Sequence, residues 1–513
     1  MSSSYSETVS THQDFSTKPI EELLRELKTK LKLVFHDRAN IDQLALKRGW
    51  PSFVLREIMS INPLSIAIPK EYGGRGGIVK ENLGLLSTAS YESLSLSLMF
   101  GINYALFLQP IGKYGQEALK AKVFKRFLEE KTMGGLMITE PEYGSDALNM
   151  HTSFTKKDNQ YHIKGTKHWA GLTGWAEYWL LTARQQEKSG ELGRDIDFFV
   201  TDANEPDQQI MVEELYDNIG LYAIPYGRNR IDVKVPSINK LQPHTSGIKM
   251  MLDLLHRSRM QFPGMGMGFI HRMLDEAITH CQKRFVGGKS LLNYDQVQHR
   301  LSKLQASFTI CSAMCVNSSE SAKLDADMSP HGLEANAIKS IVTDLMQEAA
   351  QSVVQLVGAE AYKIKHIAGR GMVDSRPFQI FEGSNDILYA QITEGLIKLM
   401  KRAKENNLFQ FLKSYSLTNQ AIDYVKELMN FNLDMNMPQR KLVKMGKILG
   451  YTISLNYVLA LAKKGFCKDL IENAITILQQ DISSHMTSFS TKNKINVVED
   501  YQGSSDWMSF ANA

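Results

Sequence analysis

An acidic residue, Glu382, stands between Phe381 and Gly383 in the segment QIFEGSNDIL (379–388). Burying an unpaired charge costs much free energy. Taken alone, the segment is therefore either a surface turn that exposes Glu382 to water or a pocket that holds the acid for a chemical reason. An apolar pocket raises the pKa of a carboxylate and makes it a stronger base. In the second alternative the neighbouring Ile380 and Phe381 would line the pocket, and the rest of the chain has to decide between the two.

A loop that could bind a ligand stands at 137–154, MITEPEYGSDALNMHTSF. Thr139, Gly144 and Ser145 could offer hydroxyl and backbone N–H groups, and a plain helix-to-strand connection is the alternative. Further on, KHWAGLTGWAEYW places Trp169 inside a predicted strand. Its indole could cover one face of a flat ring, or it could belong to the core.

A third candidate is RFVGGKSLLNYDQVQHRL (284–301), which combines Arg284, two glycines and Gln296. A guanidinium with a closely approaching backbone suits a pyrophosphate, and an interhelix loop is the alternative. The segment EYGGRGG (71–77) lacks the strand and helix of a dinucleotide-binding fingerprint. Cys311 and Cys315 lack a neighbouring His or Cys cluster, so packing is the preferred reading and no metal site is predicted.

The bulk composition limits the classes of protein that remain. The chain has 513 residues, 43% of them hydrophobic and 22% charged, with a formal net charge of +4. A small net charge on so long a chain does not suggest a polyanionic partner such as nucleic acid. The N-terminal stretch resembles neither a signal nor a transit peptide, and no run of about 18 apolar residues predicts a membrane span. We expect a cytoplasmic protein.

These motifs must be positioned by helical and β-rich regions that alternate along the chain. Helical periodicity resumes after a group of short β-rich runs, of which QYHIKGTKHW and AEYWLLTARQ are examples. The segment ESLSLSLMFGINYALFLQPI is almost uncharged and should be a helix buried on all sides. The predicted regions are a disordered tail (1–19), an N-terminal helical domain (20–134), a β domain (135–240), a helical bundle with the base (241–403), a C-terminal helical extension (404–485) and a tail (486–513).

Taken together and in this order, the motifs resemble the acyl-CoA dehydrogenase family. The matching segments are TEPEYGSD, KHW, the loop from Arg284 to Gln296, QLVGA (355–359) and IFEGS (380–384). The resemblance covers roughly 20–400. It implies a mainly α fold with an N-terminal helical domain, a β-barrel-like middle domain and a C-terminal four-helix bundle, together with non-covalent FAD.

The resemblance also implies roles for individual residues. Glu382 becomes the base that removes an α-proton from an acyl thioester, while the β-hydrogen leaves as hydride to the flavin. In some relatives the base lies on the helix that carries Arg259. Here the residue immediately before Arg259 is Ser258, which cannot act as a base. The implied substrate-binding residues are Ser145, His256, Arg259 and Gly383. The implied FAD-binding residues are Ile138, Thr139, Gly144, Ser145, Trp169, Gly171, Arg284, Gln296, Gln355, Gly358, Ser384 and Asn385.

The chain departs from the family pattern at several of these positions. Gly171 replaces a threonine that contacts the flavin, and Thr173 could supply the hydroxyl instead. Gly287 takes the place of an aromatic residue near the adenine. Val373 replaces an arginine before the base, with Arg376 as a candidate substitute.

The implied activity is FAD-dependent conversion of acyl-CoA to trans-2-enoyl-CoA, with an electron-transfer flavoprotein as acceptor. An acyl-CoA oxidase and a DNA-binding relative without activity are the alternatives. Residues 401–513 have only a slight excess of basic residues, which disfavours DNA binding. The carrier, coenzyme A or acyl carrier protein, and the acyl chain stay open. A homo-oligomer is implied because QLVGA reaches the FAD of a neighbouring subunit, and a dimer is favoured because the helices after 403 can cover a tetramer surface.

Overall fold

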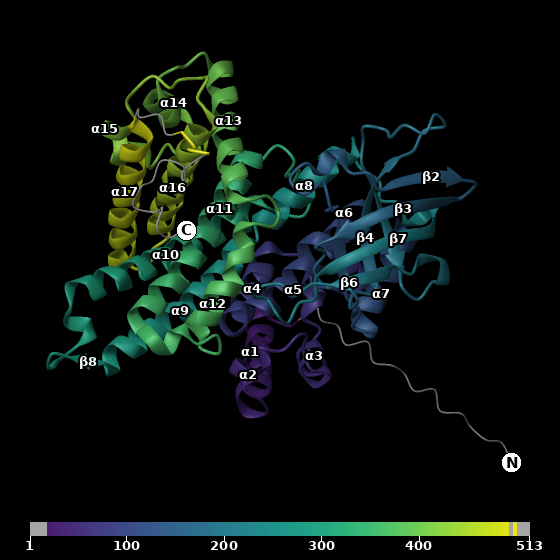
Figure 1. Cartoon of the computed structure of the whole chain (residues 1–513), viewed down its shortest axis with the longest axis horizontal. Coiled ribbons are helices and arrows are strands. Elements are labelled where there is room, and N and C mark those ends of the chain that lie inside the picture. The colour runs from purple at the N-terminus through teal and green to yellow at the C-terminus, as the bar shows by residue number, and fades with distance from the viewer. Residues whose placement is uncertain (1–17, 492–495, 500–513) are drawn as a thin grey trace, which may run out of the picture.

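The computed structural model describes residues 18–491 and 496–499 of the chain. The predicted tail 1–19 lies almost entirely outside these residues, as does most of the tail predicted for 486–513. Helix α17 (Lys468–Ser490) nevertheless continues past the predicted boundary at 485. The predicted order of helical, β and helical regions is confirmed (Figure 1).

The N-terminal region is helical and mostly buried. Its α-helices are α1 (Ile20–Lys32), α2 (Ile41–Leu44), α3 (Ser52–Met59), α4 (Val79–Glu92), α5 (Leu94–Asn103), α6 (Gln109–Tyr114) and α7 (Glu117–Glu129). Leu23, Leu27 and Leu31 give α1 a buried stripe at four-residue spacing. Every residue of α5 is buried, as its uncharged sequence predicts.

The β region forms one seven-stranded sheet with the path β1-β4-β2-β3-β7-β6, and β5 pairs with β4. The strands are β1 (Gly134–Met137), β2 (Ser153–Lys157), β3 (Gln160–His168), β4 (Tyr178–Gln185), β5 (Asp197–Asp202), β6 (Met211–Leu215) and β7 (Gly227–Pro236). Strand β4 runs parallel to β1 and β2, and the other pairs are antiparallel. In β7 buried and exposed residues alternate, so one face of this strand covers core and the other meets solvent.

The bundle contains the longest helices before residue 403. Its α-helices are α8 (Gly247–Arg259), α9 (Phe262–Lys283), α10 (Asp295–Ser321), α11 (Gly332–Val357), α12 (Ile367–Ser375) and α13 (Asn385–Ala403), of which α9, α10, α11 and α13 are the long ones. A hairpin of β8 (Phe285–Val286) and β9 (Lys289–Ser290) joins α9 to α10 and projects from the bundle (Figure 1).

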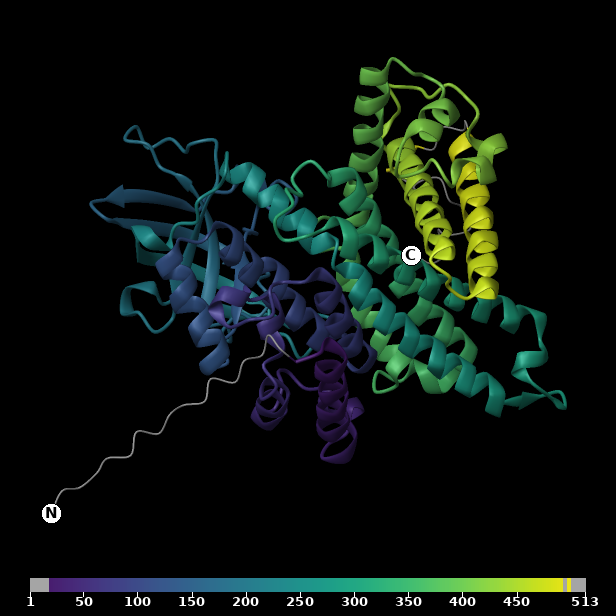
Figure 2. The ribbon, with the colours of Figure 1, turned by 180° about the vertical axis from the view of Figure 1, so that it is seen from behind.

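The C-terminal extension consists of α14 (Leu408–Ser414), α15 (Lys426–Met429), α16 (Gln439–Lys463) and α17. Helix α16 packs against α13, α11, α10 and α17, so the extension is a further layer on the bundle (Figure 2). Leu94–Tyr114 and Gln439–Lys463 are long and apolar enough to cross a membrane, but 94% and 78% of their apolar windows are buried. Buried core helices pass the same test, so these two segments are weak evidence for a span.

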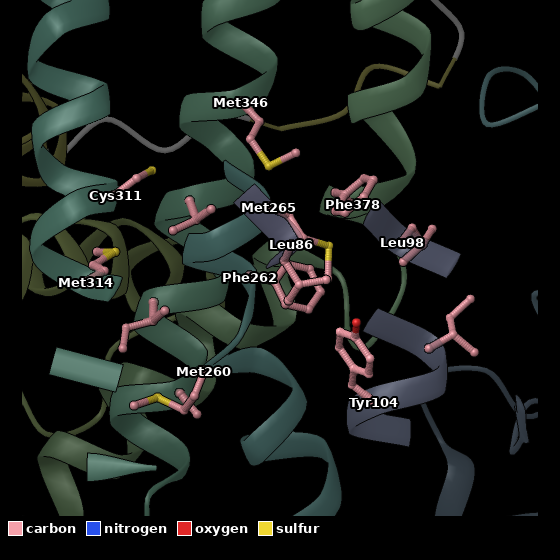
Figure 3. Close-up of a cluster of buried hydrophobic side chains, with 14 of the residues drawn as sticks. Leu86, Leu98, Tyr104, Met260, Phe262, Met265, Cys311, Met314, Met346 and Phe378 are labelled. Carbon is pink, nitrogen blue, oxygen red and sulfur yellow. The ribbon is translucent and has the colours of Figure 1, made fainter. Parts of the chain in front are cut away.

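One continuous hydrophobic core joins these regions. Figure 3 shows Met265 and Phe262 of α9 beside Leu86 of α4. Methionine side chains fill irregular gaps well, which suits the place where the bundle meets the N-terminal helices.

Candidate active site

The segment around Glu382 forms a sharp turn between η10 (Arg376–Gln379) and α13. Glu382 has φ +54° and Gly383 φ +93°, so both lie in the left-handed region. A residue with a side chain pays about 1–2 kcal/mol for this conformation. A Cβ at Gly383 would lie 2.8 Å from Leu388 Cδ2, so the position needs glycine.

The Glu382 carboxylate points toward α8 and not into water. Ser258 Oγ donates a hydrogen bond of 2.9 Å to Glu382 Oε1, while Oε2 is buried without a hydrogen-bond partner among the described residues. Burial raises the pKa of Glu382, and Arg259, Ser258 and Lys339 oppose that rise without cancelling it. Of the two alternatives for this segment, the geometry therefore favours the held acid.

The aromatic surroundings of the turn match the sequence prediction only in part. The Phe381 ring lies 4.9 Å from that of Phe378 and 6.2 Å from that of Phe262, measured between centroids. Phe262 and Phe378 are both fully buried (Figure 3). Ile380 is 55% exposed, so the expectation that it lines the pocket is wrong for the single chain.

Two buried cations hold the backbone of the turn. Arg259 donates from Nε at 3.1 Å and from Nη2 at 2.7 Å to the Glu382 carbonyl oxygen, and from Nη1 at 2.6 Å to Asn336 Oδ1. Lys339 Nζ donates at 2.8 Å to the Gly383 carbonyl oxygen. Both cations bind main-chain carbonyls, which fixes the turn. Within 18–491 and 496–499 the carboxylate has a single hydrogen bond, the one from Ser258.

Lys339 also donates to Asn385 Oδ1 at 2.9 Å. Burial lowers the pKa of Lys339 to about 7, with Arg259 adding to the effect. The Asn385 amide donates in turn to Asp344 Oδ1 at 2.7 Å and to Thr343 Oγ1 at 3.0 Å. Asn385, predicted to bind FAD, thus has a buried side chain that is engaged within the protein. Ser384 occupies the N-cap position of α13 without a capping hydrogen bond from its side chain.

His256, predicted to bind substrate, is buried one helical turn before Arg259. Its Nδ1 lies 2.9 Å from the Met328 carbonyl oxygen, and Gly332 packs against its ring. Burial and Arg259 lower the pKa of His256 to about 4, so the ring is neutral. These contacts come from the segment that leads into α11 and from the first residue of that helix.

In the β domain, a buried ion pair connects the TEPEYGSD loop to β3. Lys167 Nζ lies 2.9 Å from Glu140 Oε1, and both side chains are at most 5% exposed. The backbone N–H groups of His151 and Thr152 also donate to Glu140. Burial opposes ionisation of Glu140, but these partners outweigh it and lower its pKa. Burial lowers the pKa of Lys167 to about 8.

Trp169 follows β3, which ends at His168, so it does not lie inside the strand as predicted. It has φ +55° and is 51% exposed, an unusual exposure for an indole. Its ring lies 4.5 Å from that of Tyr216 and 6.3 Å from that of Tyr226. The three rings make an aromatic shelf whose exposed indole a flat ligand ring could cover, which fits the isoalloxazine of FAD.

The replacement at Gly171 has a steric reason. A Cβ there would lie 2.7 Å from Ile102 Cδ1 and 3.4 Å from the Tyr226 ring. Thr173 does not take over the missing hydroxyl, because it is buried and donates to the Ala170 carbonyl oxygen at 2.8 Å. Arg376, the candidate substitute for the arginine replaced by Val373, donates from Nη1 to Gln379 Oε1 at 2.6 Å on the surface.

The remaining predicted ligand residues fall into two groups. Ile138 and Thr139 are half-buried and Gly144 and Ser145 exposed in the loop that follows β1. Arg284, Gln296, Gln355 and Gly358 are exposed on the bundle. Figures 1 and 2 both show the hairpin after Arg284 and the β domain at opposite ends of the molecule. One chain therefore does not bring Arg284 to the aromatic shelf. Among the described residues, no group of three His, Cys, Asp or Glu side chains could hold a metal ion.

Comparison with known proteins matches this architecture region by region. The models of the acyl-CoA dehydrogenase N-terminal, middle and C-terminal domains match residues 32–131, 135–233 and 245–397. Glutaryl-CoA dehydrogenase of Desulfococcus multivorans is 26% identical over 329 residues, which are 62% of this chain and 82% of that protein.

Solved structures show the same fold. Butyryl-CoA dehydrogenase from Megasphaera elsdenii superposes with a TM-score of 0.65 at 21% identity and covers 75% of this chain and 100% of its own. Acyl-CoA dehydrogenase complexed with FAD from Bacillus anthracis gives 0.74 at 17% identity over 94% of this chain and 90% of its own. A match over that share of the chain includes helices of the C-terminal extension.

The chain belongs to the acyl-CoA dehydrogenase family. It is an oxidoreductase of a class that depends on FAD.

Sequence reasoning missed the residues that support the predicted ones. Ser258 was set aside because it cannot act as a base, yet it is the hydrogen-bond donor to that base. The sequence could have indicated that Lys339 is buried, because it is a lysine within the largely apolar run of a long helix. The same holds for Lys167, because it lies on the same face of β3 as the buried Tyr161 and Ile163.

Proposed function

We propose that the chain catalyses α,β-dehydrogenation of an acyl thioester, from acyl-CoA to trans-2-enoyl-CoA, with Glu382 as the catalytic base. The observation that carries the proposal is the asymmetry of the Glu382 carboxylate. Oε1 is fixed by Ser258, while Oε2 is buried and has no partner among the described residues. One oxygen is thus oriented and the other is left to accept a proton.

The chemistry explains why the base is held in this way. An α-proton is weakly acidic, so the base needs more basicity than a solvated carboxylate has, and burial raises the pKa of Glu382. Because Arg259 and Lys339 bind carbonyl oxygens of the turn, they orient the base without pairing with its carboxylate. We assign the backbone N–H of Glu382 as a donor to the thioester oxygen as negative charge develops there.

FAD supplies the oxidising part of the reaction: when bound, it accepts the β-hydrogen with its electron pair, so the substrate loses one proton and one hydride. Within one chain, Trp169, Thr139, Gly144 and Ser145 would hold it. Arg284, Gln296, Gln355 and Gly358 would reach it from a second copy, because all four are exposed and the hairpin that follows Arg284 lies at the opposite end of the molecule from the β domain.

The shared site makes a homodimer the proposed assembly. Light scattering of the FAD-loaded protein should give twice the mass of the chain, and a stable FAD-loaded monomer would contradict it. We further propose an electron-transfer flavoprotein as acceptor. Its reduction by the substrate-reduced protein should be faster than reoxidation by oxygen, and the reverse order would indicate an oxidase.

The reaction is tested by mixing the yellow protein with acyl thioesters without oxygen. Coenzyme A thioesters of short, long and branched acids, and one acyl carrier protein thioester, should be compared. Bleaching of the flavin and formation of a 2-enoyl thioester by at least one of them are expected. A protein that binds FAD but is reduced by none of them would overturn the proposal.

A further inference from the structure

The carboxylate of Asp344, on α11, is bonded to both ends of the turn that carries Glu382. Gln379 Nε2, before the turn, and Asn385 Nδ2, after it, each donate to Asp344 Oδ1 at 2.7 Å. The other oxygen, Oδ2, accepts from Tyr389 at 2.9 Å and lies 3.1 Å from Lys447 Nζ. One oxygen of Asp344 thus holds the turn, while the other is held by α13 and by α16 of the extension.

The turn depends on such support because its backbone is unfavourable. Glu382 sits at φ +54°, a conformation that persists only where surrounding contacts determine it. Arg259 and Lys339 hold the two carbonyls inside the turn. Asp344 fixes the residues on which the turn begins and ends.

Helix α16 packs closely against α11 and α13. A Cβ at Gly446 would overlap the Tyr389 carbonyl oxygen, and one at Gly450 would lie 2.9 Å from Ile341 Cγ1. Thr393 Oγ1 of α13 donates to the Leu442 carbonyl oxygen at 2.7 Å. These contacts place α16 against α11 and α13 (Figure 1). They thereby fix where Lys447 meets Asp344.

Lys447 forms an ion pair with the nearly buried carboxylate of Asp344 at this junction. Its side chain is 25% exposed and that of Asp344 is 10% exposed. Removing the cation would leave a nearly buried carboxylate without its ion pair, which favours rearrangement of the side chains around it.

We propose that Lys447 is a positioning residue that links the C-terminal extension to the catalytic turn through Asp344. The extension would then set the geometry of the base and not only cover the bundle. The kinetic part of this inference rests on the proposed function, in which Glu382 is the base.

The test compares Lys447→Met with Lys444→Met in the full-length FAD-loaded protein. Lys444 lies one turn earlier on α16 and, within the part of the chain that the structure describes, donates to Ser488 Oγ of α17 at 2.6 Å on the surface, so it is a matched control. Hydrogen exchange of backbone amides in 376–388 should accelerate in Lys447→Met and stay at the wild-type rate in Lys444→Met. With a substrate that bleaches the flavin, kcat should fall about 2- to 30-fold while KM hardly changes. Lys447→Arg, which keeps the charge, should restore most of both properties.

If Lys447→Met does not fold, Lys447→Gln takes its place in the same comparison. Exchange rates and kcat equal to those of the wild type and of Lys444→Met would overturn the inference. Failure of the proposed function is distinct from this outcome, because an unreactive wild-type flavin leaves the exchange measurement intact. Faster exchange in 376–388 would then still support the link, and unchanged exchange would refute it.

Discussion

The hydroxyl of Ser258 donates to Oε1 of Glu382 over 2.9 Å, and this contact joins the end of α8 to the turn before α13. The two residues are far apart in the sequence, and neither of them makes the arrangement alone. Ser258 stabilises the ionised form of Glu382, while burial stabilises the protonated form. The balance leaves the pKa of Glu382 above its ordinary value, and it can be altered by substitution.

Ser258→Ala should raise the pKa of Glu382 further, because it removes a hydrogen bond that favours the carboxylate. A base must be deprotonated to act, so the rising limb of the pH–rate profile for flavin reduction should move to higher pH. Stopped-flow measurements over a pH series with one thioester would show the shift. An unmoved limb would mean that a group other than Glu382 controls that limb.

Lys339 should make stability depend on pH. Its pKa falls from 10.5 to about 7 on folding. Between these values the unfolded chain binds more protons than the folded one, so the free energy of unfolding should rise with pH in this window. Lys339→Met should flatten that rise. Denaturant unfolding of the two proteins from pH 7 to 10 gives their free energies of unfolding, and the difference between them is the contribution of Lys339. Parallel pH dependences of the two proteins would contradict the prediction.

Trp169→Ala should weaken FAD binding. Loss of a stacked ring costs about 0.5–1.5 kcal/mol beyond buried area, so an increase of about tenfold in the Kd for FAD is expected. Equilibrium titration of the apoprotein by flavin fluorescence measures it. Tyr424→Ala, at a half-exposed ring in the extension, serves as the control and should leave the Kd unchanged. Equal effects of both substitutions on the Kd would show that Trp169 does not contact the cofactor.

Lys167→Met should destabilise the protein by about 3–5 kcal/mol, because it leaves Glu140 buried without its ion pair. Removal of the exposed Lys468, which lies 3.5 Å from Glu472, should cost under about 1 kcal/mol. Denaturant unfolding gives both values. The double variant Glu140→Gln with Lys167→Met should recover part of the loss, and a sum of independent losses would show that the two residues do not act as a pair.

Much of the fold could be predicted because local patterns agree with it. The four-residue spacing of leucines in α1 and the uncharged run of α5 correspond to the helices observed. The alternation in β7 corresponds to a strand with one buried face. At the site, Glu382 stood out because an acid in an apolar segment requires an explanation.

The supporting contacts could not be predicted because they join segments that are distant in the chain. Ser258, Lys339 and Asp344 reach the turn from α8 and α11, and only the packing of these helices brings them there. The exposure of Ile380 was missed because its apolar side chain suggested burial. The separation of Arg284 from Trp169 depends on the arrangement of whole domains, which no local pattern encodes.

The central claim, that Glu382 is the catalytic base, is tested most directly by anaerobic flavin reduction in Glu382→Gln. The amide keeps the size of the side chain and removes its basicity, so fold and FAD content should be unchanged. We expect the rate of reduction by a good thioester substrate to fall about 10²- to 10⁴-fold, while Glu382→Asp keeps part of the activity. A glutamine variant that reduces its flavin at the wild-type rate would contradict the assignment.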